Sequence, residues 1–161
     1  MTFRIQEATD NDIELLARLI RQSFRDVAAH FQLTPENCPT HPSNCQPEWI
    51  AADLNEGKTY FIMMADNIPC GCVAVQQPQP DIWDLERLAI LPEYRRQGLG
   101  KTLVEYVLHE TGRCGGKQVH LALIADHVKL RRWYEKLGFR VMQTRRYPKL
   151  PFAVTFMSKS L

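Results

Sequence analysis

The turn R-R-Q-G-L-G at residues 95–100 contains the residue types that could bind an anion. Gly98 and Gly100 lack side chains, so a ligand could approach the backbone closely there. A helix is predicted to follow, and the unpaired N–H groups and positive dipole end at a helix start attract phosphate. Arg95, Arg96 and Lys101 add positive charge at the same place. The turn is therefore predicted to bind a phosphate or pyrophosphate group.

Two carboxylates, Asp84 and Glu86, could act as a general base. They are two residues apart on a predicted strand, so both face the same side of the sheet. His120, on the next predicted strand, is a third candidate base. The alternative is that the carboxylates form an exposed strand face or pair with Arg87 or another base. Both interpretations stay open at this point.

The elements that must position these residues follow from hydrophobic periodicity, which predicts a single domain over residues 1–161 of the α/β (α+β) class. The predicted strands lie near 3–5 and at 59–64, 70–75, 82–90, 119–125, 140–147 and 152–157. The predicted helices begin at 13, 49, 101 and 129. Four prolines between residues 31 and 48 predict an irregular segment there, and Pro78 and Pro80 are expected to break the third strand.

Composition excludes several classes of protein. The net charge of +2 is too small to indicate a nucleic-acid partner. No apolar run reaches the roughly 18 residues that a membrane helix needs, and no secretory signal is apparent, so no membrane partner is expected. The five cysteines are odd in number and not spaced as a disulfide framework. A cytoplasmic location is expected.

Three motifs in order resemble the GNAT superfamily of N-acetyltransferases over residues 85–139. The first is R-L-A-I-L-P-E-Y at residues 87–94, which resembles the fourth strand of that family and the loop after it. The second is the turn itself, in which Arg95, Gly98 and Gly100 match the family pattern. The third is W-Y-E-K-L-G-F at residues 133–139.

The resemblance implies a GNAT-type mixed, mostly antiparallel sheet of about seven strands, flanked by about four helices. Its fourth and fifth strands would splay apart around the pantetheine arm of acetyl-CoA, the expected co-substrate. The backbone of Leu88, Ala89 and Ile90 would then bind that arm, while their side chains pack in the core. The pyrophosphate would be bound by Arg95, Arg96, Gln97, Gly98, Leu99, Gly100 and Lys101.

The resemblance also assigns catalytic roles. Tyr134 matches the family tyrosine that lies near the thioester sulfur and protonates the leaving thiolate. Glu86 is the first candidate for the base and Asp84 the second, and a water chain could also serve. His127 stands where the family usually has an asparagine that contacts the cofactor. It could bind the cofactor or cap the following helix.

The resemblance implies that the segment from residue 26 to residue 57 borders the acceptor. It contains five carboxylates and no lysine or arginine, and Phe31 and Trp49 add aromatic surface. Together with Glu86, this composition favours a cationic primary amine as the acceptor, either a small molecule or a protein amine. The alternative is an ordinary solvated surface. Either a monomer or a homodimer is expected.

Two other classes of protein remain as alternatives. A non-catalytic acyl-CoA-binding sensor would keep the phosphate site without the chemistry. A zinc-binding interaction module would use Cys38, His41 and Cys45, with His30 as a possible fourth ligand. Packing of the cysteines as small hydrophobic residues is the simpler interpretation, and no metal is expected.

Overall fold

The structure is a computed structural model that describes residues 1–161. The strands are β1 (Phe3–Glu7), β2 (Thr59–Ala65), β3 (Ile68–Gln79), β4 (Ile82–Ile90), β5 (Gln118–Ile124), β6 (Arg140–Arg146) and β7 (Ala153–Ser160). The helices are α1 (Ile13–His30), α2 (Pro47–Asn55), α3 (Leu99–Arg113) and α4 (Val128–Lys136). Short 3₁₀ turns lie at Asp10–Asp12, Pro42–Asn44 and Pro92–Tyr94.

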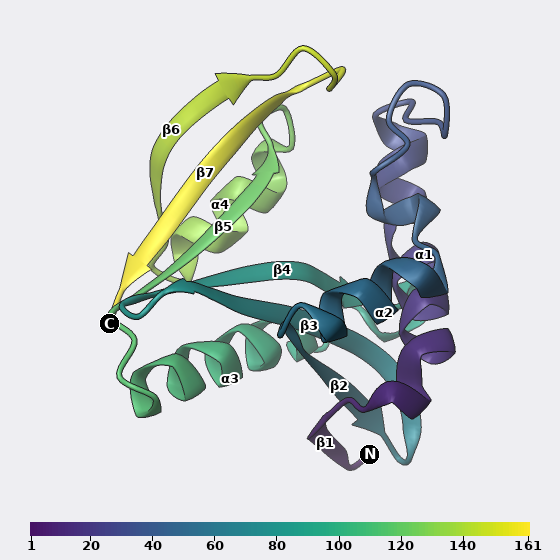
Figure 1. The fold of residues 1–161 in the computed structure, drawn as a ribbon, viewed down its shortest axis with the longest axis vertical. Coiled ribbons are helices and arrows are strands. Elements are labelled where there is room, and N and C mark those ends of the chain that lie inside the picture. Colours follow the sequence, from purple (N-terminus) through teal and green to yellow (C-terminus); the bar gives the residue numbers. More distant parts are fainter.

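The seven strands form one sheet in the order β1-β2-β3-β4-β5-β7-β6. Every neighbouring pair is antiparallel except β4 and β5, which are parallel. These two strands pair only from Ile82 to Asp84, opposite Gln118 to His120. Beyond that point β5 and β7 rise away from β4 (Figure 1). The predicted splayed, mixed sheet of seven strands and four helices is therefore confirmed.

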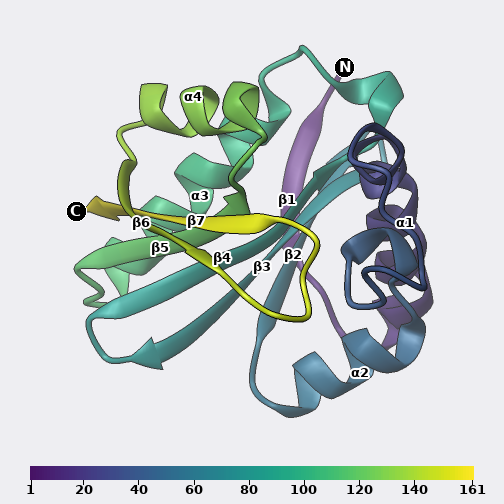
Figure 2. The ribbon, with the colours of Figure 1, turned by 90° about the horizontal axis from the view of Figure 1, so that it is seen from above.

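Two hydrophobic clusters cover the two faces of the sheet. One packs α3 and α4 against one face, with Leu103, Val107 and Phe139 among its buried members. The other packs α1 and α2 against the opposite face, around Leu16 and Ile50. Figure 2 shows the two pairs of helices on opposite sides of the strands. The split between β4 and β5 therefore opens between two well-packed layers.

A β-bulge interrupts β4 in the middle of the candidate site. Ala74 of β3 pairs with Glu86, and Cys72 pairs with Ala89, so two residues of β4 lie opposite one residue of β3. Arg87 takes the extra position with φ 50°, in the left-handed region that non-glycine residues rarely adopt. With the bulge, Arg87 reaches Asp53 of α2, while Glu86, opposite Ala74, reaches Lys58 just after that helix.

The third strand is longer than the sequence predicts. It runs to Gln79 through Pro78, where a strand break was expected. Pairing with β4 is irregular between Gln76 and Gln79, and a proline without an N–H group is tolerated where the ladder is already interrupted. The longer strand carries Gln76 to a position opposite Asp84.

Candidate active site

A cavity of about 330 Å³ occupies the split between β4 and β5. Two side chains with predicted catalytic roles, Glu86 and Tyr134, both line it. Most of the walls are apolar. The residues from α1, from the loop before α2 and from the segment that enters β7 are Phe24, Val27, His41, Pro42, Phe152 and Val154, and those from β4, β5 and α4 include Leu85, Arg87, Leu88, Leu121, Ala122, Leu123, Ile124, His127 and Leu130.

Glu86 is held in place by two side-chain donors. Lys58 Nζ lies 3.0 Å from its Oε2, and Gln76 Nε2 donates to its Oε1 at 2.8 Å. The same Gln76 nitrogen lies 3.2 Å from Asp84 Oδ2, so one amide bridges both candidate bases. Burial and the neighbouring Glu86 carboxylate raise the pKa of Asp84. Of the two carboxylates, only Glu86 lines the cavity.

Arg87 and Asp53 form a largely buried ion pair that joins β4 to α2. Arg87 Nη1 lies 2.6 Å from Asp53 Oδ2 and 2.6 Å from the hydroxyl of Tyr60, which itself donates to Asp53 at 2.6 Å. Trp49 packs over the guanidinium, with its ring centroid 5.9 Å away. Lys58 approaches Asp53 at 3.6 Å as well as Glu86. This network holds the bulge that positions Glu86.

Replacing Asp53 with Ala is expected to lower the free energy of unfolding by about 2–4 kcal/mol. The change leaves the Arg87 guanidinium buried without its counter-charge, at a residue whose positive φ already needs support. Urea denaturation of the variant checks this. Glu56→Ala, an exposed carboxylate directly after the same helix, is the control and should change the value by less than about 0.5 kcal/mol. Equal effects of the two changes would contradict the structural role.

Tyr134 is buried in α4 between Trp133 and Phe139, with ring centroids 5.0 and 5.5 Å from its own. Its hydroxyl makes no hydrogen bond within the protein and belongs to the wall of the cavity. Burial raises the pKa of Tyr134 far above its ordinary value. The hydroxyl is therefore protonated at neutral pH, as a proton donor must be.

The start of α3 has the features of an anion site. The backbone N–H groups of residues 96–101 donate no hydrogen bond within the protein, and no side chain caps the helix. Gly98 has φ 79°, and a Cβ atom built on it would meet nothing within 4 Å. The exposed side chains of Arg96 and Lys101 lie beside these groups, although Lys101 also contacts Glu105 at 3.7 Å. Gln97 and Leu99 each present a backbone N–H group that has no partner in the protein.

Two residues of this turn have surroundings that the sequence does not predict. The side chain of Arg95 points to α1, where it donates to Asp26 at 2.5 Å and to the carbonyl of Ser23 at 2.6 Å, and its Nε donates to the carbonyl of Ile90. Its charge is therefore neutralised away from the N–H groups. Gly100 makes room for Trp133, whose ring lies 3.4 Å from the position of an added Cβ.

The edge of β4 that faces β5 has no strand partner beyond Asp84. Leu88 and Ile90 pack their side chains on the α3 side, and Ala89 packs on the side of α1 and α2, as their expected core role requires. His127 caps α4 by accepting from the N–H of Leu130 at 3.4 Å, while its ring lines the cavity. Burial lowers the pKa of His127.

The expected acidic border of the acceptor site is not formed as predicted. None of the five carboxylates between residues 26 and 57 lines the cavity. Asp26 pairs with Arg95, and Asp53 with Arg87. Phe31 and Trp49 do not line the cavity either. Each instead contacts a residue that does: Trp49 contacts Arg87, and the Phe31 ring lies tilted against the His127 ring with the centroids 5.5 Å apart. The five carboxylates are Asp26, Glu36, Glu48, Asp53 and Glu56.

Several residues that line the cavity have no signal in the sequence. Nothing in the sequence distinguishes Phe24 and Val27 of α1, or Phe152 near β7, from residues that pack in the core. His41 is grouped in the sequence with Cys38 and Cys45, but the structure turns it toward the cavity while both cysteines are buried. No group of three or more His, Cys, Asp or Glu side chains is placed to hold a metal ion.

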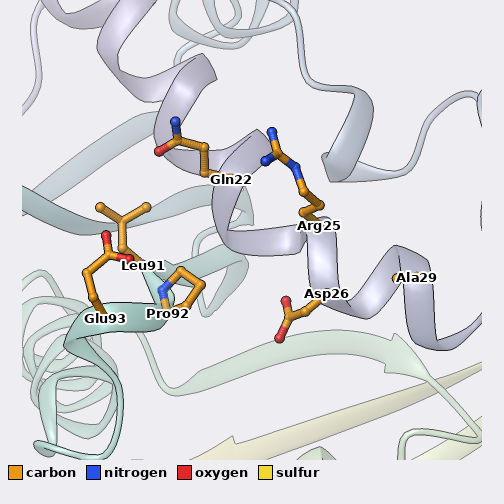
Figure 3. Close-up of a pocket in the computed structure, with 7 residues that line it drawn as sticks. All are labelled: Gln22, Arg25, Asp26, Ala29, Leu91, Pro92 and Glu93. Carbon is orange, nitrogen blue, oxygen red and sulfur yellow. The ribbon is translucent and has the colours of Figure 1, made fainter.

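A second, more open depression of about 590 Å³ lies between α1 and the segment after β4 (Figure 3). Its residues are Gln22, Arg25, Asp26, Ala29, Leu91, Pro92 and Glu93. None of the predicted catalytic residues reaches it. The chemistry is therefore assigned to the cavity between β4 and β5.

None of the helices combines the length and the apolar character that a membrane-spanning helix requires.

The site thus combines a splayed β4–β5 pair, a row of free N–H groups at the start of α3 and a buried tyrosine in the cavity wall. The acetyltransferase (GNAT) family model matches residues 17–139, and the chain belongs to this family. The predicted family is thereby confirmed.

Among characterised proteins, the chain is 32% identical to the ribosomal protein bS18-alanine N-acetyltransferase of Escherichia coli over 97 residues, which cover 58% of this chain and 66% of the relative. The match thus spans just under two thirds of that relative. Mycothiol acetyltransferase of Corynebacterium glutamicum is 34% identical over 70 residues, 44% of this chain and 24% of the relative.

Solved structures share the fold at low identity. The crystal structure of the E. coli ribosomal-protein-S18-alanine N-acetyltransferase has a TM-score of 0.79 at 19% identity and covers 99% of this chain and 94% of its own. The PaiA N-acetyltransferase of Thermoplasma acidophilum, in complex with coenzyme A, has a TM-score of 0.77 at 20% identity over the full length of both chains.

Proposed function

We propose that this protein is an N-acetyltransferase that moves an acetyl group from acetyl-CoA to a primary amine. The observation that carries the proposal is the combination of three structural features. The free N–H groups of residues 96–101 lead to the unpaired edge of β4, and the cavity beside that edge is lined by both Glu86 and Tyr134. The residues present fit coenzyme A, since N–H groups at a helix start suit a pyrophosphate. Related folds have been solved with coenzyme A or acetyl-CoA bound.

Acetyl-CoA supplies a thioester-activated acetyl group when it is bound. The Glu86 carboxylate takes a proton from the ammonium group of the acceptor, either directly or through one water, so that the nitrogen lone pair becomes available. The Tyr134 hydroxyl donates its proton to the departing sulfur and regains one from the acceptor nitrogen as the amide forms. One proton per turnover is released to solvent. Glu86 is preferred to Asp84 because only Glu86 lines the cavity.

The acceptor is proposed to be cationic before it reacts. Three carboxylates, Asp53, Asp84 and Glu86, share their surroundings with two cations, Lys58 and Arg87. If all are ionised, this cluster has an excess of one negative charge beside the cavity, which attracts an ammonium group. The names of the relatives include a ribosomal-protein alanine and mycothiol, so similarity alone favours no particular acceptor.

Replacing Gly98 with Trp is expected to weaken the binding of acetyl-CoA at least about tenfold, because a large side chain would project into the open space in front of the free N–H groups. Isothermal titration calorimetry measures this directly. Gly115→Trp is the matched control: Gly115 also has a positive φ and open space around its Cβ position, but lies at the other end of α3. Both variants carry similar backbone strain. Unchanged affinity in Gly98→Trp would refute the proposed pyrophosphate site.

A further inference from the structure

Strand β6, at one edge of the sheet, is exposed along its whole length. All seven residues from Arg140 to Arg146 are exposed, and β7 is the only strand beside it. In Figure 1 it forms the outer margin of the part of the sheet made by β5, β7 and β6. No loop or terminus of the chain bonds to the backbone of residues 140–146. The outward N–H and C=O groups of β6 are therefore free to pair with another segment.

The C-terminal part of the chain is strongly basic, although the whole chain is nearly neutral. Residues 127–161 contain nine of the twenty lysines and arginines and only one of the eighteen carboxylates, Glu135. The ion pairs of the protein include none of the three arginines of β6, which are Arg140, Arg145 and Arg146. The exposed edge therefore carries positive charge that nothing in the chain neutralises.

The two faces of β6 differ in character. Arg140 and Arg145 share one face, because they pair with residues of β7 that are four positions apart. The Arg145 guanidinium lies over the ring of Tyr147, 5.7 Å from its centroid. Val141 lies on the opposite face and is 43% exposed, with Arg146 on the same side at the end of the strand. One face thus presents two cations, and the other an apolar side chain.

The composition of β6 is that of a protein interface. Arginine, methionine and tyrosine are enriched where proteins meet, whereas lysine, glutamate, aspartate, serine and alanine are depleted there. Residues 140–147 contain three arginines, Met142 and Tyr147 and none of the depleted types. Met142 lies at an irregularity in the pairing with β7 and is 49% exposed. This composition favours a polypeptide as the partner of the strand.

A second copy of the chain does not suit this edge. An antiparallel pair of β6 strands related by a two-fold axis at Gln143 would set Arg140 of each copy opposite Arg146 of the other. Like charges directly opposite each other destabilise a sheet. Shifting the register does not relieve this, because β6 contains no carboxylate to pair with the arginines. The charge of the strand therefore calls for an acidic partner.

A nucleic acid would meet the charge but not the other features. It would leave the free strand edge and the apolar side chains of Val141 and Met142 without a partner. Residues 1–126 have six more carboxylates than lysines and arginines, so a long polyanion that extends beyond β6 would be repelled. A short acidic peptide avoids that repulsion and can also pair with the backbone.

We propose that β6 binds an extended acidic segment of a partner polypeptide, which adds to the sheet as an eighth strand. Its acidic side chains lie beside Arg140 and Arg145, and its apolar side chains lie beside Val141. Main-chain hydrogen bonds supply affinity, and the alternating side chains supply specificity. The docking site uses none of the residues assigned to acetyl transfer, so the two assignments are tested separately.

The test measures the binding of a fluorescent nonapeptide of alternating glutamate and valine by anisotropy at low salt. The wild-type protein is expected to bind it at least about tenfold more tightly than the same peptide with every backbone amide N-methylated. The methylated peptide keeps the charges but donates no main-chain hydrogen bond. A peptide of alternating lysine and valine is expected not to bind, because like charges then meet.

A double variant assigns the binding to β6. Arg140→Glu combined with Arg145→Glu is expected to weaken the binding of the glutamate–valine peptide at least about tenfold, because two attractions become repulsions. Arg18→Glu combined with Arg25→Glu is the control, since it changes the total charge equally at two exposed positions of α1. Its effect is expected to stay below about twofold. Thermal melting followed by circular dichroism checks that both variants are folded.

Four results would overturn the docking site. They are no binding of the glutamate–valine peptide, equal binding of its methylated form, equal losses in the two double variants, and tighter binding of a short single-stranded RNA that depends on Arg140 and Arg145. A wild-type dimer that dissociates when these two arginines are replaced would assign the edge to a second copy and overturn it as well. None of these results bears on acetyl transfer, which thiol release measures independently.

Discussion

Replacing Tyr134 with Phe is expected to lower kcat for acetyl transfer about 100- to 1,000-fold, which is the usual contribution of a positioned general acid. The phenylalanine ring fills the same space between Trp133 and Phe139 and removes only the hydroxyl. That hydroxyl makes no hydrogen bond in the protein, so its removal leaves no broken internal contact. The affinity for acetyl-CoA is expected to stay within about twofold.

Thiol release under saturating acetyl-CoA measures kcat of the variant, and calorimetry measures the affinity. Tyr106→Phe is the control, because the Tyr106 ring packs against Phe61 in the core and does not line the cavity. Unchanged kcat in Tyr134→Phe would exclude the tyrosine as the acid. If the wild-type protein binds acetyl-CoA but releases no thiol with any amine, the alternative of an acyl-CoA-binding sensor is favoured instead.

The parts of the site that the sequence predicts are those that depend on local structure. A glycine-rich turn before an amphipathic helix indicates an anion site because helix starts leave N–H groups free whatever the tertiary context. Tyr134 is predicted because its flanking residues resemble a family motif, and the structure places it in the wall of the cavity. The split between β4 and β5 likewise comes from the resemblance, since the hydrophobic pattern of β4 alone does not distinguish a splayed strand from a paired one.

The parts that the sequence does not predict depend on contacts between distant segments. Arg95 follows the expected pattern, yet its side chain pairs with Asp26, 69 positions earlier, and not with the proposed pyrophosphate site. Asp53 reads as part of an acidic surface, but the bulge at Arg87 brings the two together across 34 positions. Neither pairing has a periodic signal. Each charged residue has many possible partners of opposite charge along the chain, so the sequence alone does not identify the one it pairs with.

His41 illustrates the same limit at the acceptor side. Its neighbours in sequence, Cys38 and Cys45, suggest metal ligands or packing, and either interpretation would turn the histidine inward with them. The structure buries all three side chains, and the His41 ring also forms part of the cavity wall. The irregular segment therefore supplies part of the cavity wall. Its proline content does not predict this, because a loop without periodicity gives no indication of which side chains face a cavity.

Replacing Glu86 with Gln is expected to lower kcat/KM at neutral pH about 100-fold, because the ammonium group of the acceptor then has no carboxylate to take its proton. The loss should shrink as pH rises toward the pKa of the acceptor amine, since more of the amine is then already unprotonated. A pH–rate profile with a single amine measures both effects.

Asp84→Asn provides the matched control for Glu86→Gln. It removes the same charge from the same strand, beside the same Gln76 amide, at a residue that does not line the cavity. It is expected to retain most of the wild-type rate. If Asp84→Asn is the more impaired of the two, the proton must leave the acceptor through a water chain to Asp84, and Glu86 then serves to bind the ammonium group. The raised pKa of Asp84 suits that path, so the two variants together decide which carboxylate is the base.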